Sequence, residues 1–462
     1  MKLQLPINII ILGAFFLVSE SIFPQCWQSV SVGNRHTIAL TPEGSLWTWG
    51  INSIGLGDGS VHSSVPKQLG TDSDWKMIST EDTHNLALKT DGSLWGWGYN
   101  WFGQLGDGTN TDIEFLTRIG TDTDWDWVSS GISHSVGIKT DGSLWAWGSN
   151  VIGELGNGGS ENSHLPIQVV SQNDATKWKK AFAGWIITVA IKTDGTLWTW
   201  GSNSGGQLGD GTTTDKRVPT KIGTDTDWET IATGYQHVIA IKTDGTLWAW
   251  GINNFGQLGD GTNSQRLTPT QIGTDTDWNS VDAGLHHTLA TKANGTLWAW
   301  GLNRAGSVGD NTIINRNTPV QIGMDTNWES VSAGNIQSKA IKTDGNIWAW
   351  GFNNNGQVGN GTNTGSVRAP VLTNCGVLSL DDIEQNVYSV YPNPVSTILK
   401  IENILGGNYQ LDVINQLGQT VLKKDRNPSS TSLDVSALSK GIYFLNINSE
   451  NKGKQIIKFI KN

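Results

Sequence analysis

Short runs of alternating apolar and polar residues fill most of the chain, and glycine-rich turns join them. In Ala240–Gly251, AIKTDGTLWAWG, the Thr-Asp-Gly separates two such runs, which is the pattern of a β-hairpin. Along LWAWG the two tryptophans lie on one face of the strand, and Leu247 and Ala249 lie on the other. Both faces are therefore apolar, and we expect a sheet that is covered on both sides.

The W-x-W-G phrase recurs seven times at intervals of about 50 residues. Its first tryptophans are Trp47, Trp95, Trp145, Trp198, Trp248, Trp298 and Trp348. Seven sheets stacked around an axis cover one another on both faces, whereas one four-stranded sheet alone does not. The sequence therefore predicts an all-β fold, a seven-bladed β-propeller, in which the repeated tryptophans pack between blades.

The chain divides into four segments. Residues 1–25 contain the apolar run Ile9–Val18, which is too short to span a bilayer comfortably and predicts a cleaved secretory signal. The propeller is expected to cover residues 26–376, a linker residues 377–388, and a small domain residues 389–462. In that last domain the alternating runs YQLDVIN and IYFLNIN predict a small antiparallel β-sandwich.

The net charge of the chain and the motifs that it lacks exclude several classes of function. The formal net charge is −10, which opposes binding to the phosphate backbone of nucleic acids. The chain has no G-x-S-x-G, no H-E-x-x-H and no phosphate-loop lysine. The sequence thus predicts a monomer that is not an enzyme, with no catalytic residue, no cofactor and no nucleic-acid partner.

Two recurring sets of polar residues are candidate metal ligands. Five units share a histidine: His36, His84, His134, His237 and His287. The Gly-Thr-Asp-x-Asp loops carry carboxylate pairs: Asp72 and Asp74, Asp122 and Asp124, Asp225 and Asp227, and Asp275 and Asp277. A ring would spread the histidines apart, and the loops lack the rest of a calcium-binding motif. Structural histidines and turn-forming aspartates are favoured, no metal is expected, and calcium binding by the loops stays open.

The repeats resemble a known family. The A-G-x-x-H, D-G-x-x-W-x-W-G-x-N and G-Q-L-G-D-G-T signatures, from Cys26 to about Cys375, are similar to the regulator of chromosome condensation repeat. The resemblance implies a seven-bladed propeller that serves as a binding platform. Members of that family include a nucleotide exchange factor for a small GTPase, a plant ultraviolet-B photoreceptor and a secreted bacterial inhibitor of β-lactamases. A shared fold does not identify the partner.

The C-terminal segment carries a second resemblance. VYPNP at Val390–Pro394, LDVSAL at Leu433–Leu438 and KGIYFLNI at Lys440–Ile447 look like the type A sorting domain of the type IX (Por) secretion system. That resemblance implies an encounter with the type IX secretion machinery and export through the periplasm. We expect a protein that is either secreted or held at the outer-membrane surface.

The two cysteines lie at the two ends of the predicted propeller. Cys26 precedes the first patterned tryptophan, and Cys375 follows the last unit. We expect the N-terminal segment to complete a blade that the C-terminal unit leaves unfinished. A disulfide between Cys26 and Cys375 would then clasp the ring in an oxidising compartment, the alternative being two free thiols.

Candidate binding residues lie at loop positions that differ between the units. A binding platform acquires specificity when its scaffold is constant and its loop positions vary. The aromatic residues at these positions are Trp101, Phe102, Trp185, Tyr235 and Phe255. The alternative is sequence drift in loops, with incidental packing. We predict a platform for protein–protein interaction. A glycan-binding adhesin is the main alternative, and guanine nucleotide exchange follows only from family analogy and conflicts with export.

Overall fold

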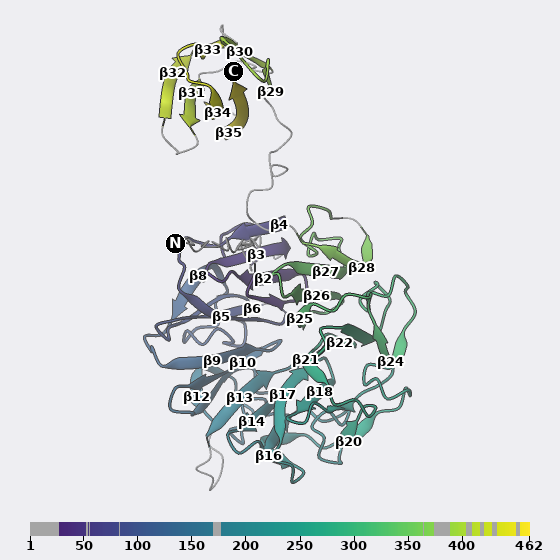
Figure 1. Ribbon diagram of the computed structural model, residues 1–462. Coiled ribbons are helices and arrows are strands. Elements are labelled where there is room, and N and C mark those ends of the chain that lie inside the picture. Colours follow the sequence, from purple (N-terminus) through teal and green to yellow (C-terminus); the bar gives the residue numbers. More distant parts are fainter. Residues whose placement is uncertain are drawn as a thin grey trace, which may run out of the picture. The chain divides into compact units, whose positions relative to one another are not determined.

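A computed structural model describes residues 27–51, 54, 56–82, 84–169, 177–363, 365–373, 389–402, 409–415, 420–426, 432–449 and 453–462. The chain forms two compact units, Met1–Val377 and Leu378–Asn462. The expected signal segment, the expected linker and both cysteines lie outside the described residues, so these predictions stay predictions. Every element of the described part is a β-strand (Figure 1).

The first unit contains seven four-stranded antiparallel sheets, which confirms the seven-bladed propeller. The strands nearest the axis are β1 (Ser29–Val32), β5 (Trp75–Thr80), β9 (Trp125–Ser130), β13 (Trp178–Ala183), β17 (Trp228–Thr233), β21 (Trp278–Ala283) and β25 (Trp328–Ala333). The second strands are β2 (His36–Leu40), β6 (His84–Lys89), β10 (His134–Lys139), β14 (Ile187–Lys192), β18 (His237–Lys242), β22 (His287–Lys292) and β26 (Gln337–Lys342).

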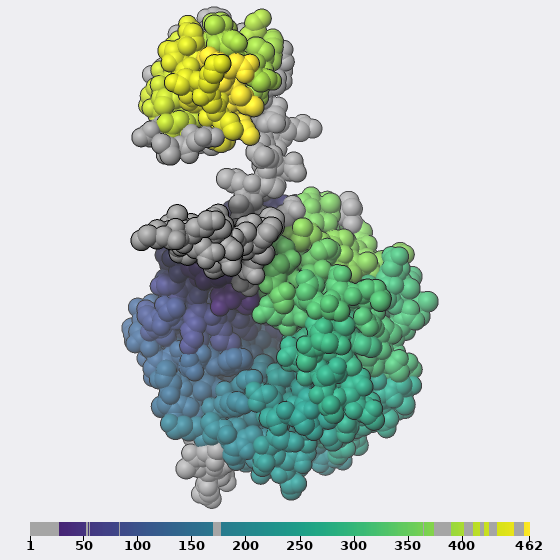
Figure 2. All heavy atoms as spheres, in the orientation of Figure 1, coloured from purple at the N-terminus to yellow at the C-terminus, as the bar shows by residue number. Residues whose placement is uncertain are grey.

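The third strand of each blade carries the W-x-W-G phrase. These strands are β3 (Leu46–Ile51), β7 (Leu94–Gly98), β11 (Leu144–Gly148), β15 (Leu197–Gly201), β19 (Leu247–Gly251), β23 (Leu297–Gly301) and β27 (Ile347–Phe352). The outermost strands are β4 (His62–Gln68), β8 (Ile113–Ile119), β12 (Ser163–Gln168), β16 (Lys216–Ile222), β20 (Arg266–Gln271), β24 (Arg316–Gln321) and β28 (Ser366–Leu372). The blades follow one another around the ring in chain order, so the green last blade meets the purple first one (Figure 2).

The repeated tryptophans join neighbouring blades, as the sequence predicted. Trp250 is fully buried in a cluster that combines residues of two blades, including Leu208 from one and Val238 from the next. Its indole Nε1 also donates a hydrogen bond to the carbonyl oxygen of Gln207 in the preceding blade, at 2.9 Å. Each W-x-W-G strand thus provides both apolar area and a directional bond across the interface.

The expectation of a shared blade was wrong, because each of the seven sheets consists of four consecutive strands. The patterned tryptophan opens the innermost strand, so one unit of sequence is one whole blade. Contacts between the last and the first blade close the ring instead: the Trp27 amide donates to the Gly345 carbonyl at 3.0 Å, and Trp49 Nε1 donates to the Gln357 carbonyl at 3.1 Å. Gln337 Nε2 donates to the Gly33 carbonyl at 2.9 Å.

The second unit is a small antiparallel sandwich, as expected. One sheet contains β29 (Ser389–Tyr391), β30 (Ile398–Glu402) and β33 (Ser432–Asp434), and the other contains β32 (Thr420–Arg426), β31 (Tyr409–Asn415), β34 (Gly441–Ser449) and β35 (Gly453–Lys461). One buried cluster spans both sheets and includes Leu399, Leu433, Val413, Leu445 and Phe459. The apolar residues of the two alternating runs therefore form the core between the sheets.

Candidate functional site

The loops between the first and second strands gather at one end of the propeller axis. They surround a space of about 10 Å³, which is room for about one water molecule and is lined by Asn34, Glu81, Asp82, Trp185, Tyr235, Leu285 and Asn335. Asn335 Nδ2 donates to Asn34 Oδ1 at 3.0 Å, and the Leu285 amide donates to the Asn335 carbonyl at 3.2 Å. The variable loop positions thus nearly close this end of the channel.

Three of the five aromatic candidates come together near this end. Trp185 and Tyr235 meet edge to face, and the Tyr235 ring centroid lies 5.5 Å from that of His286. His286 in turn lies 4.9 Å from Phe255. Sequence reasoning missed His286, although it stands at one of the variable loop positions, directly before the shared His287.

Trp101 and Phe102 lie in the loop after β7 and belong to a different surface. The Trp101 side chain is 67% exposed, packs against Tyr99 at a centroid distance of 5.4 Å, and donates from Nε1 to Asp112 at 3.2 Å. Within the described part of the chain, neither Trp101 nor Phe102 has a ring contact with Trp185, Tyr235 or Phe255. The structure therefore separates the five candidates into two groups.

The Trp101 loop belongs to an exposed band that we call the apolar rim. Its residues come from three consecutive blades: Trp101, Phe102, Phe115, Val151, Leu165 and Val218. The Gly108 amide, in the same loop as Trp101, donates to the His164 carbonyl beside Leu165, at 2.8 Å. The Gly158 amide donates likewise to Arg217 beside Val218, at 2.9 Å. The loop after the third strand of one blade is thereby held against the outermost strand of the next blade.

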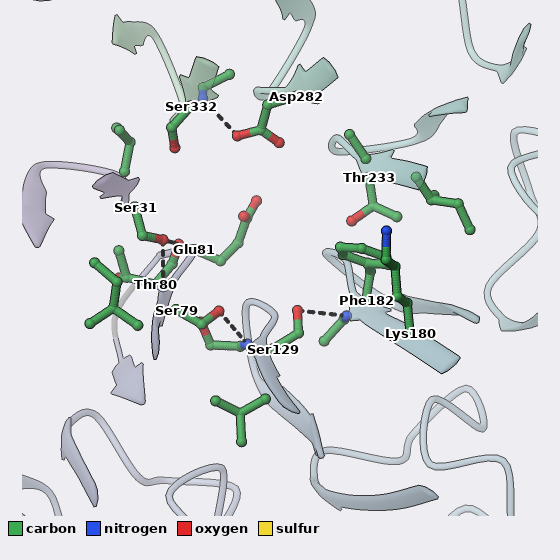
Figure 3. Close-up of a pocket in the computed structure, with 18 of the residues that line it drawn as sticks. Ser31, Ser79, Thr80, Glu81, Ser129, Lys180, Phe182, Thr233, Asp282 and Ser332 are labelled. Carbon is green, nitrogen blue, oxygen red and sulfur yellow. Dashed lines mark hydrogen bonds between the residues drawn. The ribbon is translucent and has the colours of Figure 1, made fainter. Parts of the chain in front are cut away.

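The innermost strands enclose a cavity of about 270 Å³ on the propeller axis (Figure 3). Hydroxyl side chains of these strands connect neighbouring blades. The amide of Thr80 donates to Ser31 Oγ at 3.0 Å, the amide of Ser130 to Ser79 Oγ at 2.9 Å, and the amide of Ala183 to Ser129 Oγ at 3.1 Å. The wall of the cavity is thus largely polar backbone and hydroxyl groups in a ring.

Two acidic side chains project into this cavity, and their carboxyls point towards each other in Figure 3. Asp282 accepts from the amides of Ala333 at 2.8 Å and Ala283 at 2.9 Å. Burial raises the pKa of Asp282 to about 6, although these hydrogen bonds act in the opposite direction. Burial, then the nearby carboxyls of Asp282 and Asp82, raises the pKa of Glu81 well above its usual range.

The cavity also has a basic residue, Lys180. Its Nζ donates to the backbone carbonyl of Glu229 at 2.9 Å and lies 3.6 Å from the Glu229 carboxylate. Burial lowers the pKa of Lys180. Sequence reasoning missed Glu81, Asp282 and Lys180. Each differs from the residues at the equivalent positions of the other units, but the three lie far apart in the sequence and only the fold brings them to one cavity.

The described repeats match a family over more than half of the chain. The RCC1-like domain matches residues 125–391, and the Regulator of chromosome condensation (RCC1) repeat matches residues 27–55 and 91–138. The chain belongs to the RCC1-like domain family. Its C-terminal residues 389–462 match the secretion system C-terminal sorting domain, which marks the protein for export by the type IX system to the cell surface or the extracellular space.

Solved structures share the fold of this RCC1-like propeller. Human WBSCR16 is 20% identical, with a TM-score of 0.63 over 71% of this chain and 94% of its own. Prp20p from Saccharomyces cerevisiae is 21% identical, with a TM-score of 0.65 over 76% of this chain and 90% of its own. Yeast RCC1 (Prp20) bound to Kap60 is also 21% identical, with a TM-score of 0.65 over 80% and 88% of the two chains. No curated protein sequence matches the chain.

The five histidines of the RCC1-like propeller link its blades. Their Nε2 atoms lie 2.6–3.4 Å from side-chain oxygens of the next blade: Asn85, Ser135, Thr188, Thr288 and Ser338. Burial lowers the pKa of His84, His237 and His287 to about 3, and that of His36 and His134 to about 4. These rings are neutral at physiological pH, and the structure places them as expected of structural histidines, each beside a side-chain oxygen of the next blade and, for His134, also bonded to the backbone of Ile187.

The aspartate pairs of the RCC1-like repeats face lysines. Lys242 Nζ lies 2.6 Å from Asp225 and 3.1 Å from Asp227, and it stands over the rings of Trp228 and Trp248 at 4.8 and 4.6 Å. The blades with Lys89, Lys139 and Lys292 repeat this arrangement. Across the described chain, no three His, Cys, Asp or Glu residues are grouped to hold a metal ion.

Nothing in the described part of the chain is a helix of the length and apolar character needed to cross a membrane.

Proposed function

We propose that this exported propeller is a non-enzymatic binding protein that holds a protein partner on the apolar rim. The observation that carries the proposal is the exposure of Trp101. Soluble proteins rarely leave contiguous large apolar side chains in water, and such patches mark interaction sites. Aromatic side chains are also enriched among the anchors of protein interfaces.

The exposed aromatic residues of the described propeller, Trp101, Phe102 and Phe115, all lie on the second blade, which supports a specific docking site. The Trp101 position is occupied by Asn254, Arg304 and Asn354 in the last three blades. The Val218 position is occupied by Thr268 and Thr318 in the two blades that follow. A partner therefore meets exposed aromatic rings on the second blade, whereas the exposed large apolar residues of the described propeller outside the rim are not aromatic: Val61, Ile313, Ile314, Met324 and Leu372.

A second candidate surface for partner contact consists of Trp185, Tyr235 and Phe255. Their rings are half-buried by their contacts with one another and with His286. They stay candidates for partner contact near the axis. Prp20p, which shares the fold, has been described together with its binding to Gsp1p and histones, so a propeller of this shape serves protein binding in that case.

The test is affinity capture with the full chain from cell-envelope and host extracts. The test variant is Trp101→Ala/Phe102→Ala, and the matched control is Asn354→Ala/Asn355→Ala at the same loop positions of the last blade. A protein that the wild type and the control retain, and the test variant loses at unchanged melting temperature, supports the proposal. Equal retention by all three contradicts it. If millimolar sugar releases everything retained, the glycan-binding alternative replaces it.

A further inference from the structure

Glu81 differs from the residue that the other blades have at the equivalent position. The other six units have glycine at its position: Gly33, Gly131, Gly184, Gly234, Gly284 and Gly334. A Cβ at Gly284 would lie 2.2 Å from the carbonyl oxygen of Gly334 in the next blade, so close backbone approach explains the preference for glycine. In the second blade the chain instead places a carboxyl group there, and Figure 3 shows it directed into the cavity.

The Glu81 side chain is partly buried and lines the cavity, and no side chain or amide of the described residues gives its carboxyl a hydrogen bond or an ion pair. A buried polar group without a partner is destabilising and needs an explanation. Asp282, on the opposite wall, is held in place by two amides. The cavity therefore has one fixed and one free carboxyl facing each other.

The rest of the wall adds neutral acceptors and apolar surface. The hydroxyls of Ser31 and Ser79, which each accept from one amide, and that of Ser332, which is bonded to Asp282, also line the wall, with Val32 and Ile78 beside them. Lys180 lies farther along the wall, with its Nζ bonded to Glu229. Acceptors around two carboxyls suit a ligand that carries positive charge and several N–H donors.

We propose that the channel binds a primary ammonium group, which donates hydrogen bonds to Glu81 and Asp282. A volume of about 270 Å³ is small for a ligand pocket and suits a short aliphatic amine or one lysine side chain. Calcium takes six to eight oxygen ligands, whereas two carboxyls, one of them already engaged by amides, meet here. The space between the loops at one end of the axis has room for about one water, which is too small for this ligand.

The charges around Glu81 set the pH dependence of binding. The charged groups of the surrounding elements are Asp282 on β21, Asp82 directly after Glu81, Lys180 on β13 and Arg35 in the first loop. Burial and the nearby carboxyls raise the pKa of Glu81 and so favour its protonated form. An ammonium group favours the ionised form, so binding displaces a proton, and the affinity increases as the pH rises.

The test is isothermal titration calorimetry of the full chain with 1,4-diaminobutane. We expect saturable binding that tightens with pH and releases protons in buffers of different ionisation enthalpy. Glu81→Gln removes the charge and keeps the shape, and we expect it to weaken binding about 10- to 100-fold. Glu43→Gln, at an exposed position, is the matched control and should bind as the wild type does. Glu81→Gly, which restores the residue of the other blades, replaces Glu81→Gln if that variant does not fold.

One further ligand distinguishes the possible sources of the ammonium group. A blocked lysine, Nα-acetyl-lysine methylamide, represents the side chain of a partner protein, and binding of either amine supports the proposal. Undiminished affinity in both Glu81 variants overturns it, as does the absence of heat with both amines at millimolar concentration, or binding of calcium chloride alone. These results do not depend on the apolar rim, so this proposal and the proposed function can fail separately.

Discussion

Lys339 donates a hydrogen bond from Nζ to the carbonyl oxygen of Gln357, 2.8 Å away, inside the seam between the last blade and the first. The other blades have aliphatic side chains at the Lys339 position: Ile38, Leu86, Val136, Val189, Ile239 and Leu289. The chain thus buries an ammonium group where its repeat has an apolar side chain. Burial lowers the pKa of Lys339 to about 7.

We predict that Lys339→Met stabilises the propeller, because it replaces a buried ammonium group with an apolar side chain of similar length. The folded-state pKa lies below the ordinary value of 10.5, so the unfolded chain binds more protons between about pH 7 and 10. Wild-type stability therefore rises through this window. Denaturant unfolding should give Lys339→Met an advantage of about 2–4 kcal/mol at pH 6 that shrinks towards pH 9. Lys76→Met, at an exposed ion pair with Asp126, is the control. A pH-independent difference would contradict the prediction.

Asp282→Ala should destabilise the propeller by about 1–3 kcal/mol, because the amides of Ala283 and Ala333 lose their acceptor. The folded-state pKa of about 6 exceeds the ordinary 3.8, so the contribution of Asp282 is complete below pH 3.8 and is lost as the pH rises through 6. The difference from the wild type should be larger at pH 4.5 than at pH 7.5. Ser129→Ala, which removes an acceptor at the same strand position, should show no such pH dependence.

Calcium at millimolar concentration should leave the melting temperature unchanged, because lysines already neutralise the aspartate pairs. Lys242→Met should lower the free energy of unfolding by about 1–2 kcal/mol, through lost ion pairs and cation–π contacts. Differential scanning calorimetry measures both effects. A rise in the wild-type melting temperature with calcium would show that the loops bind the ion after all.

The predicted Cys26–Cys375 disulfide joins the two ends of the propeller sequence. In the loop-entropy account, closing so long a loop stabilises the fold by about 5 kcal/mol, and reduction should remove that amount. Alkylation under non-reducing conditions followed by mass spectrometry tests the bond directly. Two alkylated cysteines in the exported protein would disprove it.

The seven blades were predictable because their signals are local. Thr-Asp-Gly turns, alternation along LWAWG and a constant period each act within one unit. How the ring closes was not predictable in this way, since it depends on which strand of a unit lies nearest the axis. The sequence suggested a shared blade, whereas a blade of four consecutive strands starts at each patterned tryptophan.

The polar residues of the cavity were missed for a related reason. Glu81 and Asp282 belong to the second and sixth units, and only the curvature of the ring brings them face to face. The sequence did contain a signal. Glu81 stands where the other six units have glycine, and Lys339 stands where the other six units have an aliphatic residue. In a repeat protein, departures at positions that packing holds constant are as informative as departures in the loops.

Because each blade is one uninterrupted stretch of sequence, the gene is modular at the scale of the blade. A duplication or deletion of about fifty codons adds or removes a complete sheet and leaves no strand orphaned. Permuting the termini to any blade boundary likewise cuts no sheet. The chain can therefore change in the number of its blades and in the position of its termini. The residues at the seam, in contrast, are specific to the two blades that meet there.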